Sequence, residues 1–237
     1  MTSGLFSQTA DELVDKGTTE LNAKDYTSAT DDFTKAISVN PAYPDAYYMR
    51  GHVNYDQKKY SDAIPDFTKA IEVKPDYTDA YYKRAESYYN MASTDKSYMD
   101  LALSDYQKIT ELSPSFADAY YKIAEIYRLQ NQTDKAIIYF QKTADAAPAF
   151  TDAYFDMAEL YYNSKTYDKA IDNYTKAIDS DPKFADAYYK RGNSYENLTK
   201  YDLAISDWQK AIDLNGTYSA SLSSKIAAAR TKIKTTS

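Results

Sequence analysis

Residues 185–214 read ADAYYKRGNSYENLTKYDLAISDWQKAIDL, and this stretch decides the fold. In its first half, Tyr188, Tyr195 and Leu198 recur at three- and four-residue steps around the small Gly192. In its second half the same steps relate Ala204, Ile205, Trp208, Ala211 and Ile212. Because apolar residues at these steps fall on one face of an α-helix, the stretch predicts two amphipathic helices joined by a short turn.

The same pattern recurs along most of the chain. Alanines equivalent to Ala204 follow one another every 34 residues, with a single step of 39; they are Ala29, Ala63, Ala102, Ala136, Ala170 and Ala204. Fixed spacing in this range is typical of stacked supersecondary units, none of which buries its apolar face alone. The alignment gives six units: 10–43, 44–77, 78–116, 117–150, 151–184 and 185–218. Places are numbered from the first residue of each unit, so that Ala204 is at place 20.

Three places define how a unit is expected to pack. Place 8 is always small, as at Gly192, and place 24 is always a large aromatic, as at Trp208, so the aromatic is predicted to fill the space over the small residue. Place 32 is proline in five units, as at Pro182, and Gly216 stands there in the last. Proline disfavours helix in the residue before it, so the second helix is expected to end there.

A helix-turn-helix unit with small residues at places 8 and 20, an aromatic at 24 and proline at 32 resembles the tetratricopeptide repeat. The resemblance covers residues 10–218. It implies an all-α fold, a right-handed superhelical α-solenoid of six such repeats.

The flanks and one insertion complete the predicted organisation. Residues 1–9 are assigned to an N-terminal extension and residues 219–237 to a capping helix and tail, because Leu222, Ile226, Ala229 and Ile233 lie on one helical stripe. Unit 78–116 is five residues longer than the others, with the excess within 92–101. Either its first helix runs on or its turn becomes a loop.

Composition excludes several function classes. A formal charge of -7 opposes binding to nucleic acid phosphates, and no apolar run is long enough to insert into a membrane. With no cysteine, one histidine and no phosphate-loop, zinc or calcium motif, we expect no enzyme activity, catalytic residue, cofactor or metal site. Residues 1–9 lack the features of a secretory signal, so the compartment stays open: cytoplasmic or, if a signal has been removed, periplasmic or extracellular.

Function is therefore expected at a surface. In the resembled family the first helices line a concave groove, faced by places 2, 5, 6, 9, 12 and 13. At place 5 this chain carries aromatics in five units: Tyr48, Tyr82, Tyr121, Phe155 and Tyr189. Places 6 and 9 add Lys83, Lys122, Lys190, His52, Glu86, Glu125, Glu159 and Asn193. These residues form the predicted peptide-binding groove.

The leading hypothesis is a non-enzymatic scaffold that binds a protein or peptide segment in this tyrosine-lined groove. Because acids outnumber bases there, a partner with basic and apolar residues is expected. The clamp with which some family members hold a chaperone's C-terminal carboxylate is missing. Two alternatives stay open: the tyrosines pack only against their neighbours, or the chain self-assembles into homo-oligomers, although a monomer is expected.

Overall fold

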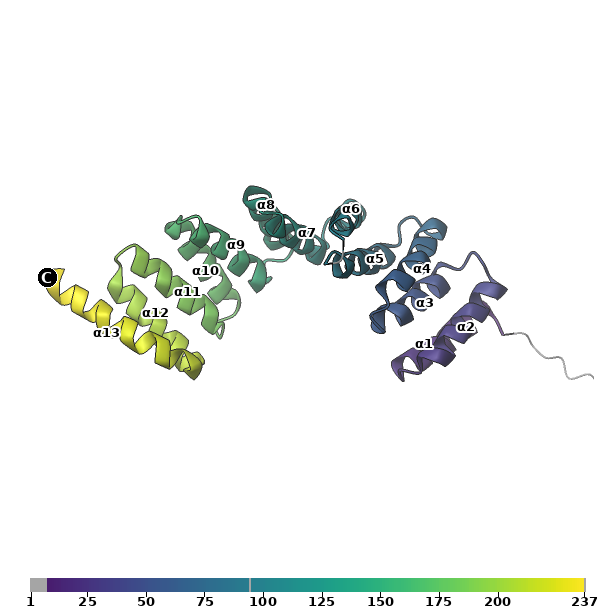
Figure 1. Cartoon of the computed structure of the whole chain (residues 1–237), viewed down its shortest axis with the longest axis horizontal. Helices are drawn as coiled ribbons and strands as arrows, with labels where there is room; N and C mark the ends of the chain where they lie inside the picture. Colours follow the sequence, from purple (N-terminus) through teal and green to yellow (C-terminus); the bar gives the residue numbers. More distant parts are fainter. Residues whose placement is uncertain (1–7, 94, 237) are drawn as a thin grey trace, which may run out of the picture. The chain divides into compact units, whose positions relative to one another are not determined.

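The computed structural model describes residues 8–93 and 95–236, in which α-helices and one short 3-10 helix occur and no strand (Figure 1). The predicted extension at residues 1–9 therefore lies mostly outside the described residues. In chain order the elements are α1 (Ala10–Asn22), α2 (Tyr26–Val39), α3 (Pro44–Asp56), α4 (Tyr60–Val73), α5 (Thr78–Met91), α6 (Ser97–Leu112), α7 (Ala117–Leu129), α8 (Thr133–Ala146), α9 (Thr151–Asn163), α10 (Tyr167–Ser180), α11 (Ala185–Asn197), α12 (Tyr201–Leu214), η1 (Gly216–Tyr218) and α13 (Ser219–Thr236).

The chain forms two compact units, residues 1–119 and 120–237, called here the N-terminal and C-terminal units. In the N-terminal unit each helix contacts the next one in sequence, and the first helices of successive pairs also touch, α1 on α3 and α3 on α5. In the C-terminal unit the contacts run from α8 to α13 in the same stepwise manner. Packing between sequence neighbours is the arrangement of a helical-repeat solenoid, which confirms the predicted all-α fold class.

The small place 8 and the aromatic place 24 meet as predicted. A Cβ atom on Gly17 would lie 2.8 Å from the ring of Phe33, and one on Gly192 would lie 2.7 Å from the indole of Trp208. Both aromatic rings are fully buried. The small residue therefore lets two helices approach closely enough for the aromatic to lie between them.

The turn inside each helix pair has a conformation that the sequence pattern did not indicate. In five pairs a three-residue turn joins the helices, and its middle residue has a positive φ: Lys24, Lys58, Asn131, Lys165 and Thr199. At Thr199 the amide donates to the carbonyl of Glu196, and the amide of Lys200 donates to the carbonyl of Tyr195. This pair of bonds is a Schellman motif, whose left-handed position is usually glycine.

The long unit departs from this turn. Its first helix α5 is 14 residues long and its second helix α6 is 16, against 13 and 14 in the other pairs, and the connection covers residues 92–96. No residue described in that connection has a positive φ. The insertion therefore lengthens both helices and the loop together, so both alternatives from the sequence hold in part.

The second helix of each pair ends just before the residue at place 32. Five of them end two residues before a proline, at Val39, Val73, Leu112, Ala146 and Ser180, and α12 ends two residues before Gly216. At the last end, α13 packs on α12 through Leu222 and Ile226, next to Trp208. Of the stripe predicted for a capping helix, Leu222, Ile226 and Ala229 are thus buried in the cluster with α12, and Ile233 is partly buried.

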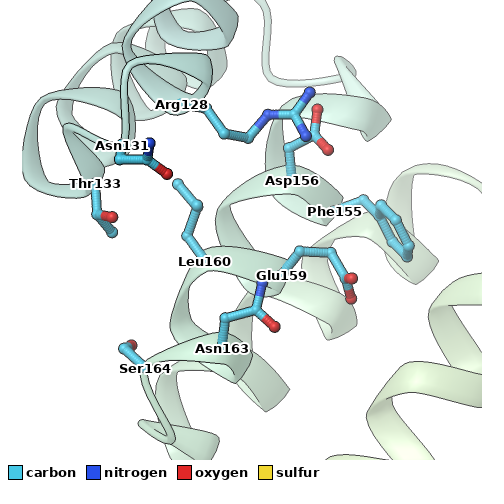
Figure 2. A pocket seen from close by; sticks show the side chains of 9 residues that line it. All are labelled: Arg128, Asn131, Thr133, Phe155, Asp156, Glu159, Leu160, Asn163 and Ser164. Carbon is cyan, nitrogen blue, oxygen red and sulfur yellow. The ribbon is translucent and has the colours of Figure 1, made fainter.

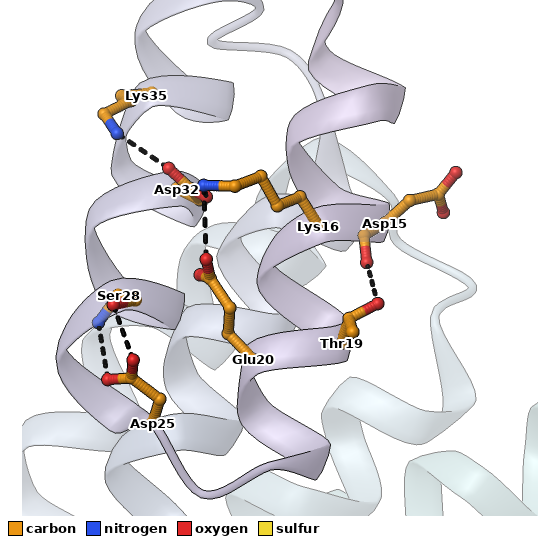
Figure 3. Close-up of polar contacts among 8 residues, drawn as sticks. All are labelled: Asp15, Lys16, Thr19, Glu20, Asp25, Ser28, Asp32 and Lys35. Atoms are coloured by element: carbon orange, nitrogen blue, oxygen red, sulfur yellow. Dashed lines mark hydrogen bonds and ion pairs between the residues drawn. The ribbon is translucent and has the colours of Figure 1, made fainter.

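Charged pairs tie the two helices of several pairs together. In the first pair, the Lys16 ammonium contacts the buried Asp32 of α2 and also lies 3.2 Å from Glu20 on its own helix, while Lys35 lies 2.7 Å from Asp32 (Figure 3). Hydrogen bonding to Lys16 and Lys35 lowers the pKa of the Asp32 carboxyl. Lys16 holds place 7 and Asp32 place 23, a pairing that recurs with arginine elsewhere.

Candidate functional site

The aromatic residues at place 5 are half-buried by aromatics of their own chain. In the N-terminal unit, the Tyr48 ring lies 5.1 Å from that of Tyr77 and 5.8 Å from that of Phe67. Burial, with nearby Asp79, Glu86 and Asp56, raises the pKa of Tyr48 to about 12. Tyr82 packs on Tyr106 and Phe116 at similar distances.

The C-terminal unit repeats this arrangement. Centroid distances to the aromatic at place 34 are 5.0 Å for Tyr121 and Phe150, 4.8 Å for Phe155 and Phe184, and 5.0 Å for Tyr189 and Tyr218. Each ring at place 5 therefore joins its helix to the segment that leads into the next pair. These side chains stabilise the fold whatever else they contact.

In the N-terminal unit the charged residues of the predicted groove pair among themselves. Lys83 lies 2.8 Å from Glu86 and its ammonium stands 4.5 Å over the ring of Tyr55. His52 Nδ1 is 3.5 Å from the Asp56 carboxylate and makes no hydrogen bond. Burial lowers the pKa of the His52 imidazole, and Lys83 lowers it further against the opposing effect of Asp56.

The same holds for most of the groove residues in the C-terminal unit. Lys122 lies 2.7 Å from Glu125. Glu159 receives Lys190 from α11 at 2.6 Å on one oxygen and the Tyr174 hydroxyl on the other. Each oxygen of Glu159 therefore already accepts one donor of the chain, and its charge is paired with that of Lys190.

Asn193 has a structural role in this arrangement. It is only 6% exposed, and its side-chain oxygen accepts the indole N–H of Trp208 at 3.1 Å and the Lys225 ammonium of α13 at 3.0 Å. Since a buried tryptophan needs an acceptor for its N–H, Asn193 supplies that acceptor rather than an exposed amide. Asn193 was predicted to face the peptide-binding groove, but its side chain is buried.

An opening on the first-helix face lies between α7 and α9 in the C-terminal unit, and we call it the α7–α9 cleft. It encloses about 590 Å³. Its lining residues come from α7, the first residue of α8, α9 and the turns that follow α7 and α9: Arg128, Asn131, Thr133, Phe155, Asp156, Glu159, Leu160, Asn163 and Ser164 (Figure 2). Of the predicted groove residues, only Phe155 and Glu159 line it.

A smaller cleft of about 360 Å³ lies between α1 and α3 in the N-terminal unit. Tyr48 and His52 line it with Met49 and Asp56 of α3 and with Leu21 of α1. These residues hold places 5, 9, 6 and 13 of one repeat and place 12 of the repeat before it. The α7–α9 cleft uses the equivalent places, so the two openings are the same feature of the repeat.

At two other positions of the repeat, residues at places 12 and 6 contact each other. In two cases a lysine at place 6 covers the tyrosine ring at place 12 of the repeat before it: Lys83 stands over Tyr55 at 4.5 Å, and Lys190 over Tyr162 at 5.9 Å. At the α7–α9 cleft these places hold Arg128 and Asp156. The space that a Lys–Tyr pair would fill is then open.

Asp156 was missed as a site residue, although a signal for it was present. It replaces the lysine that occupies place 6 in three other repeats. Its Oδ2 accepts the Tyr121 hydroxyl at 2.6 Å. Burial raises the pKa of the Asp156 carboxyl, and the Tyr121 hydrogen bond and the Arg128 charge oppose that rise.

Over the described ranges 8–93 and 95–236, no cluster of three or more His, Cys, Asp or Glu side chains could hold a metal ion. Within the same ranges, no helix combines the length and apolar character needed to cross a membrane.

Comparison with known proteins gives a consistent result. Residues 73–237 match the model of the tetratricopeptide repeat protein 21 C-terminal ARM domain, and residues 44–77 match that of the tetratricopeptide repeat. No curated relative matches the chain with significance.

Similar solved structures share the fold at low sequence identity. YrrB, a TPR protein with an unusual peptide-binding site, is 23% identical, with a TM-score of 0.65 over 81% of this chain and 97% of that one. The C-terminal part of a TPR repeat-containing protein from Cytophaga hutchinsonii is 18% identical, with a TM-score of 0.73 over 91% and 84%. PilF of Pseudomonas aeruginosa is 15% identical, with a TM-score of 0.69 over 91% and 97%. With the repeat signature, the helix pairs and the family match over most of its length, the chain belongs to the tetratricopeptide repeat family.

Proposed function

We propose that the chain is a non-enzymatic interaction scaffold that holds a segment of another protein in the α7–α9 cleft. Tetratricopeptide repeat proteins bind protein or peptide partners and are in general not enzymes, so the class follows from the family. The placement in this cleft rests on one observation. Apolar and polar side chains together line an opening of about 590 Å³ on the first-helix face.

The chemistry of the cleft favours a peptide with apolar and basic residues. Phe155 and Leu160 offer apolar surface, while Asn131 and Asn163 offer amide groups that can bond to a peptide backbone. Of its two carboxylates, Glu159 is already paired with Lys190, whereas Asp156 has no salt-bridge partner among the described residues. YrrB carries a peptide-binding site, which supports this class of ligand for a related fold.

The test is selection of random dodecapeptides by mRNA display on the immobilised full chain. Leu160→Arg places a long charged side chain in the cleft without removing any hydrogen bond described for it. Ile138→Arg is the matched control, because Ile138 is 53% exposed on α8 and does not line the cleft. We expect peptides that bind wild type and Ile138→Arg equally and lose at least tenfold in affinity with Leu160→Arg. Equal binding to all three proteins would refute the placement.

Tyr121 is a poor choice for this test. Its ring packs on Phe140 and Phe150, so truncation to alanine is expected to destabilise the C-terminal unit as well as to alter the surface. Substitutions of residues that line the opening separate binding from folding more cleanly.

The alternative function is self-assembly into homo-oligomers. Most of the apolar stripe of α13 is already buried in the cluster with α12, and its exposed surface carries small and basic residues such as Ala227, Ala228 and Arg230. That arrangement disfavours growth through this end of the chain. Light scattering coupled to size exclusion, over a hundredfold concentration range, is expected to give a constant monomer mass. A mass that rises with concentration would favour assembly.

A further inference from the structure

Asp156 is unusual among the carboxylates of the α7–α9 cleft. Its Oδ2 accepts the Tyr121 hydroxyl at 2.6 Å, and among the described residues no lysine, arginine or histidine lies within ion-pair distance of it. The side chain is neither fully buried nor exposed, and it lines the cleft. A carboxylate in this setting has one oxygen free to accept a charged donor.

The neighbouring acids differ in this respect. Both oxygens of Glu159 are occupied, one by Lys190 and one by the Tyr174 hydroxyl. Glu125 lies 2.7 Å from Lys122 and 3.7 Å from Arg128. Asp156 is therefore the carboxylate of the cleft that has no salt bridge to a lysine or arginine among the described residues.

We propose that Asp156 is the specificity-determining residue for a lysine or arginine side chain of the bound segment. The proposal rests on the function proposed above and names the chemistry of its ligand. The cationic group bonds to the free oxygen of Asp156, while its aliphatic stem lies along Phe155 and Leu160, which line the same opening. The incoming charge also offsets the desolvation that raises the pKa of the unpaired carboxyl.

Arg128 acts against this ligand. Figure 2 shows its guanidinium directed toward the Asp156 carboxylate, although the two are not within ion-pair distance, and the side chain is 42% exposed. It therefore neutralises part of the field at Asp156 and repels a second cation. Removing its charge with Arg128→Gln is expected to strengthen binding of a basic peptide about threefold.

The experiment is a double-mutant cycle on a peptide obtained by the display selection. Its basic residue is replaced by citrulline when it is arginine, or by norleucine when it is lysine, so that the length is kept and the charge is lost. Each peptide is titrated against wild type and Asp156→Asn by fluorescence anisotropy. We expect the uncharged peptide to bind wild type about tenfold more weakly, and expect Asp156→Asn to bind both peptides equally.

The control and the possible failures can be told apart. Asparagine at position 156 can still accept the Tyr121 hydroxyl, so the variant should fold, which far-ultraviolet circular dichroism checks. The inference is wrong if loss of the peptide's charge weakens binding by the same factor in wild type and in Asp156→Asn. It is also wrong if the selected peptides bind through acidic residues that depend on Arg128. Peptides that depend on Leu160 but not on Asp156 would leave the proposed function standing. Peptides whose affinity changes with neither Leu160→Arg nor Asp156→Asn would overturn both proposals.

Discussion

Arg191 of α11 holds Asp207 of α12 in a bidentate ion pair, with Nε 2.8 Å from Oδ2 and Nη2 2.8 Å from Oδ1. The remaining nitrogen, Nη1, donates to the hydroxyl of Thr175 on α10 at 2.9 Å. One arginine thus joins both helices of its own pair to the second helix of the preceding pair.

The same three-residue contact occurs twice in the N-terminal unit. Arg50 bonds to Asp66 and to Thr34, and Arg84 bonds to Asp105 and to Thr68. In the repeat that contains α9 and α10, Met157 replaces the arginine and Asn173 replaces the aspartate. In the preceding repeat, Gln141 occupies the position of the threonine. In the repeats that follow another repeat, arginine, aspartate and threonine therefore occur together or are replaced together, while the first repeat pairs Lys16 with Asp32.

This relationship predicts how the ion pair contributes to stability. Asp207→Ala leaves Arg191 half-buried without its partner and should cost about 3–5 kcal/mol. The double variant Arg191→Met with Asp207→Asn copies Met157 and Asn173 and should recover most of that loss. Urea unfolding is followed by the fluorescence of Trp208, the only tryptophan in the chain and a neighbour of Asp207. A double variant as unstable as the single one would contradict the account.

Local sequence signals were enough to predict the fold. The small residue at place 8 and the aromatic at place 24 lie within one repeat and meet directly, as Gly192 and Trp208 do. Proline acts on the residue before it. The left-handed turn at Thr199 was not predicted, because none of the five residues with positive φ is the glycine that normally marks this position.

The candidate site could be predicted only in part, because it depends on pairs of residues from successive repeats. The Lys83–Tyr55 and Lys190–Tyr162 contacts and the α7–α9 cleft each involve place 12 of one repeat and place 6 of the next, so no single repeat contains the pattern. Asn193 shared place 9 with accessible glutamates, but the tryptophan at place 24 of its own repeat needs its oxygen. The substitution of Asp156 for lysine at place 6 was the signal that could have identified the cleft.

Gly192→Ala tests the close approach of α11 and α12. The added Cβ would lie 2.7 Å from the Trp208 indole, which is fully buried, so the helices must separate at a cost of about 1–3 kcal/mol. Adding Trp208→Phe reproduces the natural combination of Ala124 and Phe140 and should recover part of the loss. Urea unfolding followed by circular dichroism measures the free energy of unfolding of each variant. Strictly additive effects of the two substitutions would show that the residues do not oppose each other.

Thr199→Gly tests the strain in the turn between α11 and α12. A β-branched residue at φ 60° is disfavoured by contact between its Cβ substituents and the backbone, so glycine should stabilise the chain by about 1 kcal/mol. Thr199→Ala keeps a Cβ at the same φ and should gain less. The midpoint of urea unfolding distinguishes them, and equal gains for alanine and glycine would indicate that strain is not the cause.

Asp156→Asn tests the electrostatic cost of the proposed binding residue. Burial raises the pKa of this carboxyl in the folded chain above its value in the unfolded chain, with Glu125 and Asp152 adding to the rise and Tyr121 and Arg128 opposing it. The unfolded chain then loses its proton at lower pH than the folded chain does, so Asp156 lowers stability as pH increases through this interval.

The free energy of unfolding of Asp156→Asn is therefore expected to exceed that of wild type at pH 7, and the difference should shrink as pH falls below the unfolded value near 3.8. Asp179→Asn is the control, since Asp179 is exposed on α10 and away from the cleft. Urea unfolding between pH 3 and pH 7 measures both. A variant that is less stable than wild type at neutral pH would mean that the Tyr121 hydrogen bond outweighs desolvation, and that the unpaired carboxylate is not held at a cost for a ligand.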